Sequence, residues 1–134
     1  MADIITKEKR SELMRKVKNK NTNIELLVRK ELFKRGYRYR IKSKLYGRPD
    51  IVFPRQKIAI FCDGDFWHGK NYRKEMKNYK QFWKNKILAN INRDKTVNKR
   101  LKEEGWTVLR FWKVDLLRDL ESCVQRVEIS LSNL

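Results

Sequence analysis

Two acidic residues lie where two short apolar segments begin and end. Asp50 stands at the start of one segment, and Asp63 directly follows the other. If segments 50–53 and 57–62 pair as a hairpin through the turn at 54–56, Asp50 and Asp63 approach each other at one end of a sheet. Carboxylates that converge inside a basic protein suit a hard cation such as Mg²⁺. Beside a phosphate, this ion polarises the ester and generates hydroxide, which is the chemistry of phosphodiester hydrolysis.

Each candidate residue also has a purely structural interpretation. Asp50 follows a proline and suits a turn, and Asp63 precedes a glycine, as in an ordinary turn at a strand end. Glu25 lies three residues after Thr22, which is the spacing of a helix capping box. The single histidine, His68, suits a hydrogen-bonded side chain as well as a proton carrier. Spacing alone leaves both interpretations open for each residue.

Large aromatic side chains occur beside basic residues in two segments. Phe66 and Trp67 are adjacent in an expected loop, and Trp83 lies among lysines. Exposed aromatic rings beside basic residues suit stacking on bases or wedging between them. The alternative is that these rings fold back onto the sheet as part of the core.

The charge of the chain indicates a polyanionic partner. The 134 residues include 34 Lys and Arg against 16 Asp and Glu, which gives a formal net charge of +18. A compact protein this positive is naturally neutralised by a polyanion. Nucleic acid is the first expectation and an anionic membrane surface the second. We expect the lysine-rich stretch 70–86 to contact phosphates rather than to form only a solvated helix face.

Several classes of protein are excluded by what the sequence lacks. No apolar run approaches the roughly 20 residues that span a bilayer, and the first residues do not resemble a secretory signal. Cys62 and Cys123 are far apart, so a cysteine-rich zinc site and a disulfide framework are not expected. One histidine and no G-x-S-x-G motif disfavour a hydrolytic triad, and a P-loop motif is absent. We expect a soluble, cytosolic and reduced protein.

Hydrophobic periodicity predicts an α/β fold with a mixed central sheet flanked by helices. The whole chain, 1–134, is expected to form a single domain, with a basic N-terminal helix within residues 1–20 that contacts the nucleic acid. The expected helices cover 8–20, a segment from about 22 to the residue before Gly36, 76–104 as one or two helices, and about 114–131. The expected strands cover 37–41, 50–53, 57–62 and 106–112.

Six short motifs follow one another in the order of a known family. They are Arg10-Ser11-x-x-Met14-Arg15, Asn21-Thr22-x-Ile24-Glu25, Gly47-Arg48-Pro49-Asp50-Ile51-Val52, Gly64-x-Phe66-Trp67-His68, Phe82-Trp83-x-x-Lys86-Ile87-x-x-Asn90-x-x-Arg93-Asp94 and Gly105-Trp106-x-Val108-Leu109. With these motifs, the chain resembles the very short patch repair endonucleases over about residues 9–115. That family has a restriction-endonuclease-like fold.

The resemblance implies Mg²⁺-dependent nicking of duplex DNA beside a T:G mismatch. By motif, Asp50 resembles the metal-binding catalytic aspartate, and Glu25 an acidic residue that acts on the metal through water. The backbone carbonyl of Cys62 would be a further ligand. His68 resembles the histidine that positions or deprotonates the attacking water.

The resemblance also implies a set of side chains that enter the DNA. The aromatic wedge from the major groove would consist of Phe66, Trp67 and Trp83. Met14, on the N-terminal helix, resembles the side chain inserted from the opposite groove. Lys86 and Asn90 occupy positions that contact bases.

The sequence departs from the family pattern at two places. Asp63 stands where family members have histidine, so either Asp63 and His68 form the proton-transfer pair or Asp63 is an additional metal ligand. The positions of the family's structural zinc ligands hold Asp65, Lys70 and Tyr72. These side chains include no Cys or His, so we expect no structural zinc.

The sequence therefore predicts a Mg²⁺-dependent endonuclease that nicks one strand of double-stranded DNA, at or next to a T:G mismatch, in mismatch repair. The alternatives are a restriction-type or invasive endonuclease with another specificity, and a DNA-binding module without catalysis. We expect a monomer in the cytoplasm, associated with the nucleoid, with no membrane contact and with other mismatch-repair proteins as potential partners.

Overall fold

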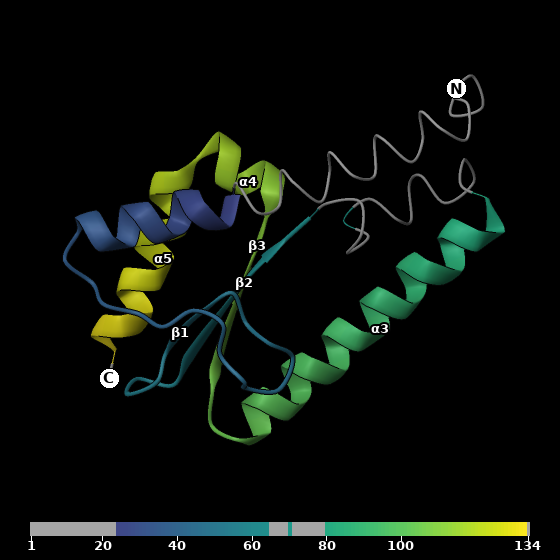
Figure 1. Ribbon diagram of the computed structural model, residues 1–134, viewed down its shortest axis with the longest axis horizontal. Helices are drawn as coiled ribbons and strands as arrows, with labels where there is room; N and C mark the ends of the chain where they lie inside the picture. Colours follow the sequence, from purple (N-terminus) through teal and green to yellow (C-terminus); the bar gives the residue numbers. More distant parts are fainter. Residues whose placement is uncertain (1–23, 65–69, 71–79, 134) are drawn as a thin grey trace.

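A three-stranded mixed sheet forms the centre of the molecule (Figure 1). The computed structural model describes residues 24–64, residue 70 and residues 80–133. The strands are β1 (Ile51–Phe53), β2 (Ile58–Asp63) and β3 (Thr107–Trp112), in the order β1-β2-β3. β1 runs antiparallel to β2, and β3 runs parallel to β2. The hairpin expected through the turn at 54–56 is confirmed.

Helices cover both faces of this sheet. One helix spans residues 24–34, and the others are α3 (Gln81–Glu103), α4 (Lys113–Arg118) and α5 (Leu120–Ser132). In Figure 1, α3 lies on one side of the sheet, and helix 24–34, α4 and α5 lie on the other. No helix in the described part of the chain is long and apolar enough to cross a membrane.

The core is divided by the alternation of side chains along β2. Ile58, Ile60 and Cys62 pack into a cluster with helix 24–34, α4 and α5. Ala59 and Phe61 pack on the other face, against residues of α3. Every residue of β2 is buried because both faces are covered. The predicted α/β fold with a mixed sheet flanked by helices is confirmed, and it is consistent with a restriction-endonuclease-like fold.

Helix 24–34 ends where the sequence predicts. Gly36 has φ of +92°, a left-handed conformation that glycine adopts without steric cost. The Gly36 N–H donates to the Phe33 carbonyl and the Tyr37 N–H to the Leu32 carbonyl, each at 3.0 Å. These bonds satisfy the last carbonyls of the helix. The Thr22 cap lies outside the described residues, as does the predicted helix 8–20.

An ion-pair network fixes helix 24–34 against α5. The Arg35 guanidinium donates from Nη1 to Glu128 Oε1 at 2.6 Å and from Nη2 to Glu121. The Tyr37 hydroxyl donates to the second Glu128 oxygen at 2.9 Å. Hydrogen bonds to Glu31 and to the two glutamates of α5 raise the pKa of Arg35. The helix that carries Glu25 is thereby held to the C-terminal part of the chain.

The predicted strand 37–41 is wrong. This segment makes only one isolated bridge, between Arg40 and Val52. The alternation is real, because the Tyr37 and Tyr39 rings both pack edge-on against Phe53. The chain turns away directly afterwards at Lys42, which has φ of +54° and cannot continue a ladder.

The prediction of one continuous closing helix over about 114–131 is also wrong. The structure has two helices, α4 and α5, which are separated at Asp119. Asp119 has extended φ of −150°, and its Oδ1 accepts a hydrogen bond of 3.1 Å from the Ser122 N–H. This is an N-cap, which starts a new helix. The hydrogen bonds from Ser122 lower the pKa of Asp119.

Within the described residues, the segment expected as one or two helices over 76–104 forms the continuous α3 from Gln81 to Glu103. Residues 76–79 lie outside the described part. Strand 106–112 is confirmed as β3.

The loop before β1 is built against α3. Gly47 has φ of +80° and Arg48 has φ of +49°. A Cβ atom at Gly47 would lie 2.4 Å from Val97 Cγ1 of α3, so the backbone there approaches the helix as closely as it can. The Arg48 N–H donates to the Leu45 carbonyl at 2.9 Å. This packing fixes the start of β1 relative to α3.

We expect Gly47→Ala to destabilise the protein more than Gly36→Ala. Both positions have positive φ, which costs an L-residue about 1–2 kcal/mol. Only Gly47 adds a steric clash, and overpacking of this kind costs about 1–3 kcal/mol, whereas a Cβ at Gly36 meets nothing within 4 Å. Thermal melting of the two variants measures the difference. Equal melting temperatures would show that the loop yields without cost.

Candidate active site

Asp50 directly precedes β1 and is held against β2 by two hydrogen bonds. Its backbone N–H donates to the Ile60 carbonyl at 2.9 Å. Its side-chain Oδ2 accepts a hydrogen bond of 2.7 Å from the Cys62 N–H. The carboxylate is therefore fixed at the carboxyl end of β2, where Asp63 follows. The sequence expectation that Asp50 and Asp63 meet at one end of the sheet is confirmed.

A hollow of about 240 Å³ opens beside Asp50. Its walls come from the loop before β1, the end of β2, the middle of α3 and one side chain of β3. Its charged lining consists of Arg48, Asp50, Asp63, Arg93, Asp94 and Arg110. Asn90 also lines it, so the α3 residue predicted to contact bases lies at the same hollow as Asp50.

The environment of Cys62 reveals which carboxylates face this edge of the sheet. Burial raises the pKa of the Cys62 thiol, and the negative charges of Asp50, Glu25 and Asp63 raise it further. The thiol is thus protonated at neutral pH and is no nucleophile. Glu25 thus lies near enough to Cys62 for its charge to act on the thiol. Glu25 also forms an ion pair of 3.4 Å with Arg29, one turn later.

Asp63 is engaged by Arg110, a residue that the sequence analysis missed. Asp63 is 5% exposed, and both of its oxygens accept hydrogen bonds of 3.1 Å from Arg110 Nη1. Arg110 Nε donates to Asn98 Oδ1 at 2.6 Å, and Nη1 lies 3.5 Å from Asp94 Oδ1. The guanidinium carbon is 4.0 Å from the centre of the Phe61 ring. An arginine within the otherwise apolar β3 was the available signal.

The described base-contact candidates lie on α3. Trp83 packs edge-on against Phe82, with ring centres 5.0 Å apart, and Lys86 Nζ lies 5.6 Å from the Phe82 ring centre. Phe82 is 62% exposed, so this aromatic and basic group faces solvent. Trp83, Lys86 and Asn90 recur at the spacing of one helix face. The other predicted DNA contacts and the predicted proton carrier, Met14, Phe66, Trp67 and His68, lie outside the described residues.

The donor set at this edge suits Mg²⁺ by its chemistry. The described residues contain no group of three or more His, Cys, Asp or Glu side chains that could hold a metal ion by itself. Mg²⁺ does not require one, because it typically uses one or two carboxylates together with water and substrate phosphates. The described candidates for such oxygen ligands are Asp50, Glu25 and the backbone carbonyl of Cys62. Of the family's zinc positions, only Lys70 is described, and the expected absence of zinc stays a prediction.

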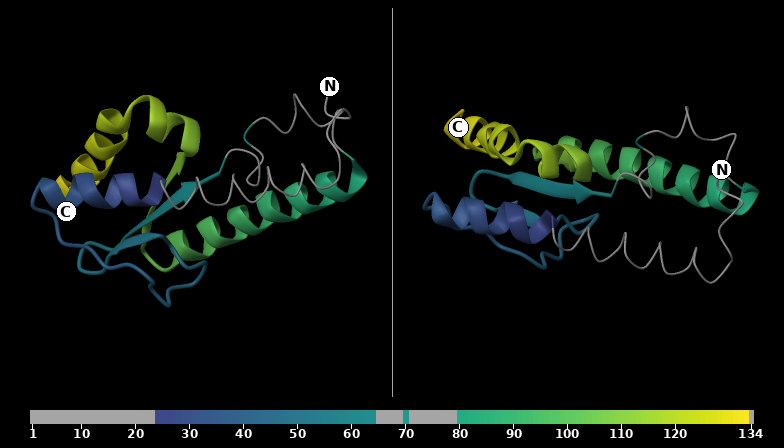
Figure 2. Two further views of the ribbon diagram at one scale, coloured as in Figure 1. Left: turned by 45° about the horizontal axis from the view of Figure 1, so that its top comes forward. Right: turned by 90° about the horizontal axis from the view of Figure 1, so that it is seen from above.

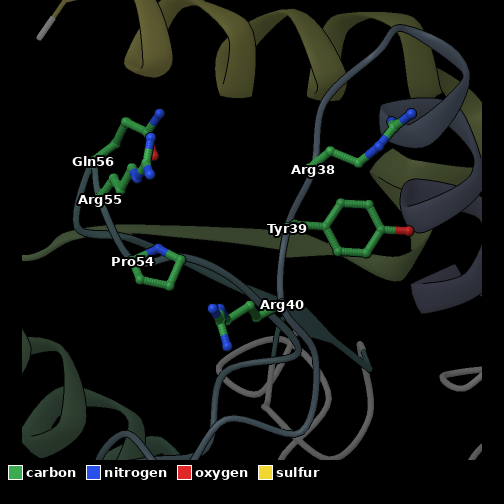
Figure 3. Close-up of a pocket in the computed structure, with 6 residues that line it drawn as sticks. All are labelled: Arg38, Tyr39, Arg40, Pro54, Arg55 and Gln56. Atoms are coloured by element: carbon green, nitrogen blue, oxygen red, sulfur yellow. The ribbon is translucent and has the colours of Figure 1, made fainter.

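A second hollow, of about 550 Å³, lies at the opposite end of β1 (Figure 3). Its basic lining residues are Arg38, Arg40 and Arg55, and the lining includes no carboxylate. Figure 3 shows the Tyr39 hydroxyl pointing out toward helix 24–34, where it donates to the Arg29 carbonyl at 2.9 Å. Figure 2 gives two further views of the sheet between its helices.

Residues 2–74 match the model of the protein family that is described as DNA mismatch endonuclease Vsr. This is more than half of the 134 residues. The chain belongs to the Vsr family. The match includes Glu25, Asp50, Cys62 and Asp63, whereas the α3 and β3 residues that line the hollow lie beyond it.

Curated relatives agree with this membership. The type II nicking enzyme V.HpaIIP of Haemophilus parainfluenzae is 46% identical over 124 residues, which cover 89% of this chain and 88% of the relative. The type II nicking enzyme V.NmeDIP of Neisseria meningitidis serogroup C is 43% identical over 129 residues, 93% of this chain and 87% of the relative. DNA mismatch endonuclease Vsr of Escherichia coli strain K12 is 36% identical over 119 residues, 87% and 76% respectively. This Vsr-family protein is an endonuclease that nicks DNA.

In this Vsr-family protein, we expect Arg110→Met to be strongly destabilising. The substitution leaves Asp63 as a buried charge without its cation, which typically costs about 3–5 kcal/mol. Adding Asp63→Asn removes that charge and should restore most of the loss. Urea unfolding of the wild type, the two single variants and the double variant measures the coupling. If the double variant loses the sum of the single losses, the pair is not a stabilising unit.

Proposed function

We propose that this protein is a Mg²⁺-dependent endonuclease that nicks one strand of duplex DNA at or next to a T:G mismatch, as a step of mismatch repair. The observation that carries the proposal is the fixed Asp50 carboxylate, which lines a hollow together with Asn90 of α3. The name of the Escherichia coli relative, a DNA mismatch endonuclease, supports the mismatch specificity. We further propose that the enzyme acts as a monomer in the cytoplasm, on the nucleoid.

Asp50 and the Cys62 carbonyl would hold the metal, with Glu25 acting through water. When bound, Mg²⁺ would polarise the phosphate ester and lower the pKa of the attacking water. The hydrogen bond from the Cys62 N–H orients the Asp50 carboxylate, so little side-chain entropy remains to be lost on metal binding. By the family motif, we assign to His68 the role of accepting a proton from the attacking water.

We assign Asp63 to the support of the site rather than to the metal. Two hydrogen bonds from Arg110 already occupy its oxygens, and Arg110 also donates to Asn98 of α3. Together these contacts link the end of β2 to the helix that carries Asn90. Where the family pattern has histidine, this chain would thus use a charge pair between β2 and β3, tied to α3 through Asn98.

Mismatch preference would come from the cost of deforming the duplex. A wobble pair is stacked and paired less firmly than a matched one, so the insertion of aromatic rings costs less there. Trp83, with the exposed Phe82 and Lys86 beside it, is the described part of such a wedge. Phosphate contacts from the many Lys and Arg side chains would supply affinity without sequence preference.

We expect Asp50→Asn to reduce nicking by at least about two orders of magnitude, because the charge that holds the metal at the phosphate is lost. DNA binding should persist, since phosphate contacts elsewhere supply it. Glu25→Gln should lower the rate less, because Glu25 would act only through water. Nicking of an end-labelled T:G duplex and a parallel binding titration measure both effects.

Asp115→Asn is the matched control for this test. Asp115 lies on α4, is exposed and is not part of the hollow. The Asp115→Asn variant loses one carboxylate charge, as Asp50→Asn does, and it should nick DNA at the wild-type rate. A folded Asp50→Asn protein that nicks as fast as this control would refute the assignment of the site.

A further inference from the structure

The three arginines at the hollow beside Asp50 differ in their partners. Arg110 donates to Asp63 and Asn98 and lies near Asp94. Arg48 and Arg93 line the same hollow. Arg48 lies in a loop, and its only hydrogen bond to other described residues runs from its backbone N–H to the Leu45 carbonyl. Neither the Arg48 nor the Arg93 guanidinium forms an ion pair with a described residue, and both residues are exposed.

Arg48 is kept in a strained backbone conformation at this place. Its φ of +49° lies in the left-handed region, which residues other than glycine seldom adopt. The conformation is fixed by its N–H bond to Leu45 and by the close packing of Gly47 on Val97. Stacking of Arg100 of α3 on the Tyr46 ring, at 4.0 Å, holds the same loop. Such strain persists only where the surrounding structure imposes it, and it is concentrated at functional sites.

Arg93 lies at the hollow from the side of α3. It follows Asn90 by three residues, so the two side chains share one helix face. Because the loop before β1 packs on α3 at Val97, Arg48 and Arg93 belong to neighbouring walls of one hollow, which Asp50 also lines. The two arginines without ion pairs therefore share this hollow with the carboxylate that we assign to the metal.

We propose that Arg48 and Arg93 form an arginine clamp that binds backbone phosphates of the strand to be cut and holds the scissile phosphodiester at Asp50. The ligand class is a DNA phosphodiester, which the planar guanidinium can bind through two parallel hydrogen bonds. Arg110 is the arginine of this hollow whose Nε and Nη1 are already engaged, by Asn98 and Asp63. The clamp rests on the proposed nuclease function and adds to it the residues that position the substrate.

The test compares Arg48→Gln, Arg93→Gln and the double variant with Arg55→Gln as a matched control. Arg55 is exposed in the turn between β1 and β2 and lines the second hollow instead. Binding to a matched 20-base-pair duplex is titrated in EDTA at several salt concentrations, so neither metal, nicking nor a mismatch enters this measurement. Nicking of a T:G duplex is then followed in Mg²⁺ with saturating enzyme, and thermal melting verifies the fold of each variant.

We expect each clamp variant to lower the slope of log K against log salt by about 0.9, since each loses one phosphate contact. At saturating enzyme, nicking should fall at least tenfold for each clamp variant, because the phosphodiester is misplaced even when DNA is bound. Arg55→Gln should show the wild-type nicking rate and a smaller change of slope.

The clamp is wrong if the slopes of both variants equal that of the wild type, if saturated nicking is unchanged, or if Arg55→Gln has the same effects. These outcomes leave the proposed nuclease function standing, provided that the wild type nicks. If the wild type does not nick in Mg²⁺, the proposed function fails, and the binding titration in EDTA alone decides whether Arg48 and Arg93 contact phosphates.

Discussion

The hydrogen bond of 2.7 Å from the Cys62 N–H to Asp50 Oδ2 is the contact on which the site depends. It joins the first residue before β1 to the carboxyl end of β2, and it orients the carboxylate that we propose as catalytic. The contact requires the antiparallel register of Ile51 with Ile60, which the short turn at 54–57 sets. Every residue of β2, Cys62 included, is buried between the helices that cover the two faces of the sheet.

The second requirement is that α3 keep a fixed position relative to this end of the sheet. Two sets of contacts secure it: Gly47 against Val97 from the loop, and Arg110 of β3 with Asp63, Asn98 and Asp94. The residues that we assign to DNA lie on the same helix as those that pack on the catalytic strand. In our proposal, recognition by α3 and cleavage at Asp50 are thus parts of one rigid arrangement.

The sequence predicted local elements well where one signal was dominant. Gly36 ended its helix, and the apolar segments at 51–53 and 58–62 formed the hairpin that brings Asp50 to Asp63. Segment 37–41 alternates as a strand does, yet Lys42 turns the chain away after a single bridge. The Arg110–Asp63 pair joins residues 47 positions apart, so no local pattern could reveal it. Asp119 caps a new helix in the structure, whereas the sequence analysis predicts one continuous helix over about 114–131.

The central claim is that Asp50 and its neighbours support a metal-dependent nick directed by a mismatch. Its most direct test is to incubate the full chain with end-labelled duplexes that differ only in one T:G or T:A pair, in Mg²⁺ or in EDTA, and to map the products on both strands. We predict a single nick, in one strand of the T:G duplex, that requires Mg²⁺. Equal cutting of the matched duplex would contradict the mismatch specificity, and cutting in EDTA would contradict the metal-dependent mechanism.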